Sequence, residues 1–171
     1  MKLSAEVNQR KENMNPLDLA GYIVKHCLNT NQEISNLQLQ KILYFVQLQS
    51  LMNADDFSVA IMPEAEFEAW KFGPVIKDVY YAYSINAGLP IYKVSDGCSM
   101  IDNVPKYVDK VVDHSLTLDP WELVKISHRE GGAWRKTYIP GSKLTIPNDE
   151  IIADSHSLKV SLICKWSEIN F

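Results

Sequence analysis

Residues 35–52, SNLQLQKILYFVQLQSLM, decide how this chain folds. Ser35 and Gln38 have the spacing of a helix capping box, so a helix is expected to begin here. A helix whose circumference is almost entirely apolar is buried on all sides. We therefore predict that a helix over residues 37–52 forms the centre of the domain. Its apolar positions are Leu37, Leu39, Ile42, Leu43, Phe45, Val46, Leu48 and Leu51.

Four further segments combine apolar residues at helical spacing with helix end signals. In two of them a capping residue precedes a proline, which is favoured at the first helical position. The expected helices cover residues 16–28, begin at Pro105, run from Asp119-Pro120 to about Glu130, and begin at Asn148. Residues 91–94 and 144–146 could form short strands, and residues 159–166 could be strand or helix.

The stretch 68–76, EAWKFGPVI, changes period in the middle. Phe67 and Ala69 alternate with glutamates, which predicts a small hairpin or a short edge strand up to Trp70. Gly73 and Pro74 have the character of a helix cap and a first helical residue. We therefore predict a helix from Gly73-Pro74 to Gly88. Its core-facing positions would be Ile76, Val79, Tyr80, Tyr83 and Ala87.

These elements predict a mainly α fold with a small α+β component. We expect a compact multi-helix single domain around the central buried helix, with a small β-hairpin or short edge strands. The chain has 171 residues, of which 46% are hydrophobic, and this is enough to bury a core. The polar segment 1–13 is expected to be a flexible tail, and residues 14–171 the domain.

Charge and cysteine content narrow the class of protein. Lysine and arginine number 17 against 21 acidic residues, for a net charge of -4 and without a basic block, so nucleic-acid binding is not expected. Cys27, Cys98 and Cys164 are too few and too scattered for a disulfide framework. We find no signal peptide and no apolar stretch of membrane-spanning length. We expect a cytoplasmic protein with no membrane partner.

The usual signatures of catalytic chemistry are missing. The four histidines lack metal-ligand spacing, and the chain has neither a glycine-rich phosphate loop nor a GxSxG elbow. We expect no metal and no cofactor. His128 and Glu130 could form a general acid–base pair. Alternatively, His128 bonds a backbone carbonyl and holds the end of its helix, which is the reading that a lone histidine near an apolar face favours.

The aromatic residues leave similar alternatives open. Trp70 and Trp134 could each anchor a binding partner or fill the core, and for Trp70 the adjoining strand favours the core. Tyr80, Tyr81 and Tyr83 could stack on nucleic-acid bases. Helical spacing, however, places Tyr80 and Tyr83 on the apolar face, so packing explains two of the three.

Three segments in order resemble one family. They are LQKILYFVQ at residues 39–47, EAWKFGPV at residues 68–75, and LVKISHREGGAW at residues 123–134. Together they resemble the Panacea domain family of SocA-like antitoxins, also known as phage-associated protein GepA. The similarity spans about residues 16–155. The motif positions that carry it are Lys41, Tyr44, Trp70, Gly73, Pro74, His128, Glu130 and Trp134.

The resemblance implies a function in protein binding. Members are small cytoplasmic proteins of bacteria, phages and prophages, and several are antitoxins that neutralise unrelated toxins by direct stoichiometric binding. The expected partner is thus a cognate toxin. The SocA branch also delivers its toxin to a ClpXP-type protease, which makes a proteolytic adaptor one alternative. An enzyme centred on His128 and Glu130 is the other, although the family has no established catalytic activity.

Two departures from the family pattern lie close together. Ser127 stands where the family usually has threonine, and the hydroxyl is kept. Gly131-Gly132-Ala133 replaces the usual proline before Trp134 and adds a residue. This change predicts a looser loop between His128 and Trp134. We expect the motif residues to shape the scaffold, and variable surface residues to select the toxin.

Overall fold

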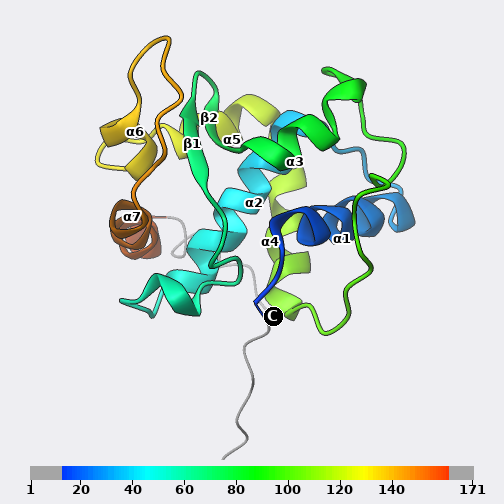
Figure 1. Ribbon diagram of the computed structural model, residues 1–171, viewed down its shortest axis with the longest axis horizontal. Helices are drawn as coiled ribbons and strands as arrows, with labels where there is room; N and C mark the ends of the chain where they lie inside the picture. Colours follow the sequence, from blue (N-terminus) through cyan, green and yellow to red (C-terminus); the bar gives the residue numbers. More distant parts are fainter. Residues whose placement is uncertain (1–12, 162–171) are drawn as a thin grey trace, which may run out of the picture.

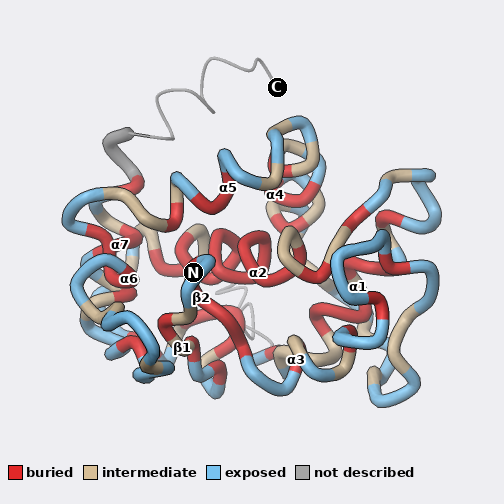
Figure 2. The backbone as a smooth tube through the Cα atoms, turned by 90° about the horizontal axis from the view of Figure 1, so that it is seen from above, coloured by how far each residue is buried: buried red, intermediate tan, exposed pale blue. Residues whose placement is uncertain are grey.

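The computed structural model describes residues 13–161, in which six α-helices and one small hairpin are arranged around a central seventh helix (Figure 1). The central helix is α2 (Asn36–Leu51), as predicted. The capping box forms: Ser35 accepts from the Gln38 N–H, and the Gln38 side chain accepts from the Ser35 N–H at 3.0 Å. In Figure 2 the buried turns of α2 lie in the middle of the molecule, and α1, α4, α5, α7 and β2 all contact it.

The predicted first helix is α1 (Pro16–Asn29). The Asn15 side chain accepts from the backbone N–H groups of the first turn, at 2.8 Å from Leu17 N. Asn31, just past the helix, adopts a positive φ of 54° and turns the chain toward α2. Residues 1–12, in the predicted tail, lie outside the described residues, as do residues 162–171 with Cys164.

The hairpin consists of β1 (Phe67–Trp70) and β2 (Gly73–Ile76), paired antiparallel with Trp70 opposite Gly73. β1 confirms the predicted strand, but the helix predicted from Gly73-Pro74 is wrong. Those residues form β2, and the helix α3 is shorter, Lys77–Ala82. A Gly-Pro pair suits a helix start and a strand equally well. Pairing with β1, which local spacing does not reveal, decides between them.

Short elements complete this half of the chain. They are the 3-10 helices η1 (Phe57–Val59) and η2 (Ser84–Asn86). No strand forms over residues 91–94, where an expected strand is replaced by a single bridge between Ser35 and Pro90. The segment 144–146 runs along β1, with one bridge between Glu68 and Thr145.

The second half is helical. The helices are α4 (Lys106–Leu116), α5 (Pro120–Ser127), α6 (Ala133–Thr137) and α7 (Asn148–Ser161). Helix α5 ends at Ser127, earlier than the predicted Glu130, and the five-residue α6 was not predicted. α7 begins at the expected residue, and it includes residues 159–161 of the segment that could have been strand or helix.

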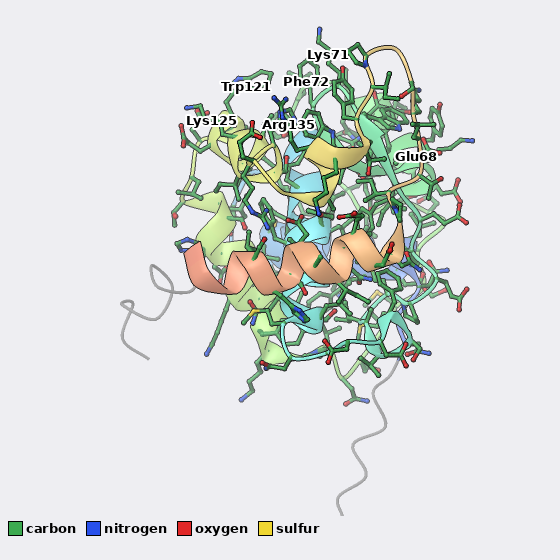
Figure 3. The ribbon with its side chains drawn as sticks, turned by 90° about the vertical axis from the view of Figure 1, so that its left-hand side faces the viewer. Glu68, Lys71, Phe72, Trp121, Lys125 and Arg135 are labelled. Carbon is green, nitrogen blue, oxygen red and sulfur yellow. The ribbon has the colours of Figure 1, made fainter. Side chains whose placement is uncertain are left out.

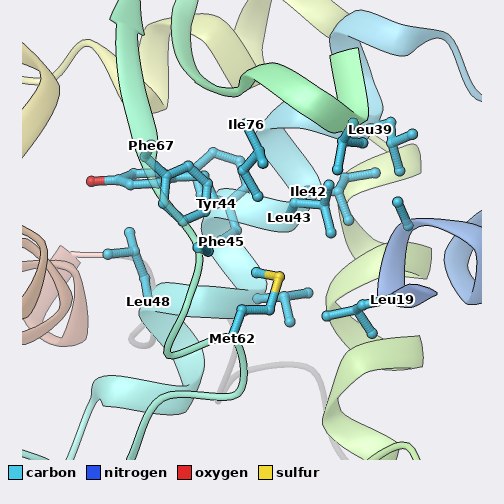
Figure 4. Close-up of a cluster of buried hydrophobic side chains, with 14 of the residues drawn as sticks. Leu19, Leu39, Ile42, Leu43, Tyr44, Phe45, Leu48, Met62, Phe67 and Ile76 are labelled. Carbon is cyan, nitrogen blue, oxygen red and sulfur yellow. The ribbon is translucent and has the colours of Figure 1, made fainter. Parts of the chain in front are cut away.

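The core is built on α2. Tyr44 and Phe67 pack edge to face with their ring centroids 5.2 Å apart, and Leu19 of α1 closes the opposite side (Figure 4). Cys27 and Cys98 form no disulfide. Within residues 13–161, no helix combines the length and the apolar character needed to cross a bilayer.

Candidate functional site

Most of the predicted motif residues meet where α2, β2 and the α5–α6 segment join. At the centre is Lys41, which is completely buried and donates a hydrogen bond from Nζ to the Pro74 carbonyl at 2.6 Å. No carboxylate pairs with it among residues 13–161. Burial therefore lowers the pKa of Lys41 from 10.5 to about 7. This lysine ties the central helix to the hairpin.

Gly73 fits closely over Lys41. Its φ of +108° lies in the region that side-chain-bearing residues avoid. A Cβ atom there would lie 2.6 Å from Ser127 Oγ and 2.8 Å from Lys41 Nζ. Ser127 is also buried, and its hydroxyl donates to the Val124 carbonyl at 2.8 Å. Backbone conformation and space therefore both require glycine at this position.

Trp134 joins α6 to the hairpin. Its Nε1 donates to the Trp70 carbonyl at 2.8 Å. One face of its ring stacks on His128, with centroids 3.5 Å apart and an interplanar angle of 2°, and Tyr138 lies 4.6 Å from it. The predicted looser loop between His128 and Trp134 stays a prediction, while the structure places the two rings parallel and in contact.

His128 differs from both predicted alternatives. Its Nε2 is buried and has no hydrogen-bond partner within the described part of the chain, so this nitrogen does not make the bond to a backbone carbonyl that was expected of the imidazole. Burial, with the charges of Lys41 and Arg135, lowers the pKa of His128 to about 4. Glu130 is exposed and pairs with Arg135 Nε at 3.3 Å. The structure therefore does not assemble a His128–Glu130 acid–base pair.

Tyr44 belongs to a second buried cluster between α2 and α7. Its hydroxyl donates to the Asp154 carboxylate, which also accepts from Arg129. Arg129 further donates to the Asp154 carbonyl at 2.9 Å and to Ser157 Oγ at 3.1 Å. Burial raises the pKa of Asp154 even beside the guanidinium. This contact could not be predicted from local sequence patterns, because Tyr44 and Asp154 are 110 positions apart.

An exposed aromatic surface beside the motif residues, formed by Phe72 and Trp121, was not predicted from the sequence. Phe72 at the hairpin tip is 44% exposed and Trp121 of α5 is 53% exposed. Their rings meet edge to face at 5.4 Å (Figure 3). The sequence placed Trp121 in the helix that follows Asp119-Pro120, without singling it out as a surface residue. The available signal was its place in the first turn after Asp119, where a helix can project beyond the core.

A pocket of about 450 Å³ opens beside these two rings. Its lining is mostly apolar and comes from α2, the hairpin, the α3 region and α5. The lining residues are Asn36, Leu37, Gln40, Lys41, Trp70, Lys71, Phe72, Val75, Tyr80, Ala87, Gly88 and Trp121. Motif residues Lys41 and Trp70 thus border the pocket, while their polar atoms bond to the protein itself.

Comparisons with known proteins identify the family. The model of the Antitoxin SocA-like, Panacea domain matches residues 39–135, more than half of the chain. Over 115 residues the chain is 33% identical to Antitoxin SocA of Caulobacter vibrioides (strain NA1000 / CB15N). That alignment covers 59% of this chain and 58% of the relative. No solved structure matches the chain. On this evidence the chain belongs to the SocA-like antitoxin, Panacea domain family.

Proposed function

We propose that this protein is an antitoxin that neutralises a toxin by direct stoichiometric binding, without making or breaking a bond. The proposal rests on family membership, together with one observation about the motif residues. Lys41, Gly73 and Trp134 bond or pack against other parts of the same chain. In this proposal the motif maintains the scaffold, and the toxin is recognised at the surface.

The arrangement of the titratable groups favours binding over catalysis. A general base must reach the proton that it removes. His128 Nε2 is buried, the face of its ring is stacked on Trp134, and Glu130 is engaged with Arg135. Lys41 has a near-neutral pKa, as a nucleophilic lysine would, but none of its surface is exposed. These side chains are better suited to holding helices together.

Coexpression with a candidate toxin, taken from a reading frame that neighbours this gene and that is toxic when expressed alone, tests the proposal. The wild-type protein should restore growth and should copurify with the toxin in a fixed ratio. Glu130→Gln should do the same, because the Glu130 carboxylate is exposed and distant from buried contacts. His128→Phe, which keeps a ring against Trp134, should also neutralise. Loss of neutralisation in both variants, with folding intact, would instead indicate a His128–Glu130 mechanism.

The half-life of the toxin separates direct neutralisation from delivery to a protease. Direct binding predicts that the toxin persists in an inactive complex at undiminished half-life, also in cells without ClpXP. A toxin that disappears faster when the protein is present, and only with the protease, would replace stoichiometric neutralisation with an adaptor function.

A further inference from the structure

The rings of Phe72 and Trp121 are exposed to solvent and contact each other at the surface. We call Trp70, Lys71, Phe72, Trp121 and Lys143 the hairpin patch. Phe72 comes from the β1–β2 turn and Trp121 from α5, so two separate elements present aromatic rings at one place. Figure 3 shows both rings at the same edge of the molecule. Neighbouring exposed aromatic rings indicate an interaction site, because tryptophan and other aromatic residues dominate the energetics of protein interfaces.

The pocket that Phe72 and Trp121 border is large enough to hold a side chain of a partner. Its 450 Å³ lies within the roughly 300–1,000 Å³ typical of ligand pockets. Leu37, Val75 and Tyr80 contribute to its walls, and Tyr80 packs on Trp70 with ring centroids 4.8 Å apart. An apolar side chain of a partner could therefore leave water completely while its neighbours rest on Phe72 and Trp121. That is the arrangement of an interface anchor surrounded by a contact rim.

The patch is basic although the whole protein is acidic. Lys143 Nζ lies 3.7 Å from the centroid of the Trp70 ring, and Lys71 Nζ lies 5.1 Å from that of Phe72. Neither lysine is in an ion pair with any described residue. Glu68 accepts a hydrogen bond from Trp70 Nε1 at 2.7 Å, and Glu122, next to Trp121 in α5, is paired with Lys125. Lys41 also borders the pocket, but its Nζ is buried against the Pro74 carbonyl, so the exposed positive charge of the patch comes from Lys71 and Lys143.

Charge and shape together specify the partner's chemistry. A matching segment must carry carboxylates to meet Lys71 and Lys143, and an apolar side chain to enter the pocket. Opposite charges across an interface accelerate association, and buried aromatic anchors slow dissociation. A basic segment would lack the charge attraction, and a purely polar segment would lack the apolar anchor.

We propose that the hairpin patch is the docking surface for the toxin, and that it binds an acidic segment of the toxin which inserts one apolar side chain into the pocket. This inference rests on the function proposed above. In this proposal the toxin contacts the exposed side chains Phe72 and Trp121, which lie next to the motif residues Lys41 and Trp70 that border the same pocket.

The test measures binding of the purified toxin to wild-type protein and to two patch variants. Phe72→Ala/Trp121→Ala should weaken the Kd by about 30-fold or more, as expected for loss of a hot spot. Lys71→Glu/Lys143→Glu should slow association, and the effect should diminish at high salt. Thermal unfolding shows that each variant is folded, and binding is compared below the unfolding transition, because Phe72 and Trp121 are about half exposed and contact each other.

Matched controls lie elsewhere on the molecule. Tyr92→Ala/Met100→Ala removes two exposed apolar side chains, and Lys93→Glu/Lys106→Glu makes the same change in net charge outside the patch. Both controls should bind as the wild type does. A wild-type protein that neither binds nor neutralises the toxin would overturn the proposed function itself.

The remaining outcomes concern the patch alone. If the wild type binds and both patch variants match their controls, the docking surface is elsewhere and the proposed function stands. If only the aromatic variant weakens binding, the patch is the surface but the toxin segment is not acidic, which overturns the proposed chemistry of the partner.

Discussion

Replacing Lys41 with methionine should stabilise the protein at acidic pH, although it removes a hydrogen bond. Lys41 is a buried ammonium without a carboxylate partner among the described residues, and its pKa falls from 10.5 to about 7. The unfolded chain therefore holds the lysine proton up to about pH 10.5, whereas the folded protein releases it above about pH 7. Folding is penalised most below the folded pKa, and the penalty is relieved as the pH rises.

The size of the effect follows from this shift. At about pH 6 the full shift of about 3.5 units costs the folded state roughly 5 kcal/mol, and at about pH 9 roughly 2 kcal/mol remain. Lys41→Met removes this penalty but leaves the Pro74 carbonyl without its donor, which costs about 1–3 kcal/mol. The variant should therefore be about 2–4 kcal/mol more stable near pH 6 and nearly equal to the wild type near pH 9.

Urea denaturation of both proteins at intervals between these pH values measures the difference directly. Comparing the two proteins cancels the titration of groups that do not interact with Lys41, including the tyrosines whose pKa is raised by burial. His128 does not cancel, because the charge of Lys41 lowers its pKa, and the loss of that charge in the variant adds stability at acidic pH in the same direction. A constant difference in unfolding free energy across this range would refute the reasoning, because it would mean that Lys41 keeps an ordinary pKa in the folded protein.

Three further predictions concern the remaining buried contacts. Gly73→Ala should cost about 2 kcal/mol more than Gly131→Ala in urea denaturation, because both sites have positive φ but only at Gly73 would a Cβ atom collide with neighbours; equal costs would contradict the close fit. Arg129→Met should destabilise by about 3 kcal/mol by leaving the Asp154 carboxylate buried and unpaired, and adding Asp154→Asn should recover part of that loss; no recovery would show that packing, not charge, is responsible. The His128 imidazole should stay neutral until about pH 4 in an NMR titration, and His128→Phe should reduce the loss of stability between pH 6.5 and pH 4, since protonation there favours the unfolded chain; a midpoint near 6.5 would exclude the buried stack.

The helical framework was predictable because its signals are local. The capping box of Ser35 and Gln38, the proline starts and the all-round apolar character of α2 each lie within one segment. The prediction failed for elements whose conformation depends on contacts with a segment far away in the sequence. α6 has five residues and no side-chain cap, and Trp134 is held by the carbonyl of Trp70, 64 positions earlier. No sequence pattern within α6 predicts that contact.

The candidate site divides in the same way. The motif residues could be named from the sequence, but their contacts could not. Glu130 matches the motif pattern and yet lies at the surface with Arg135, whereas Arg129 beside it reaches the buried Asp154. The direction in which each side chain points depends on where α5 ends, and α5 ends at Ser127, which lies against Gly73 of the hairpin.

By itself the sequence determined the class of fold, the buried central helix and the family, because periodicity, capping and ordered motifs are properties of contiguous residues. Only the tertiary structure decided that Gly73 and Pro74 form a strand, that Lys41 is buried against that strand, and that Phe72 and Trp121 meet on the surface. The free energy that selects each of these arrangements comes from contacts between segments tens of residues apart, and such contacts exist only once the chain has folded.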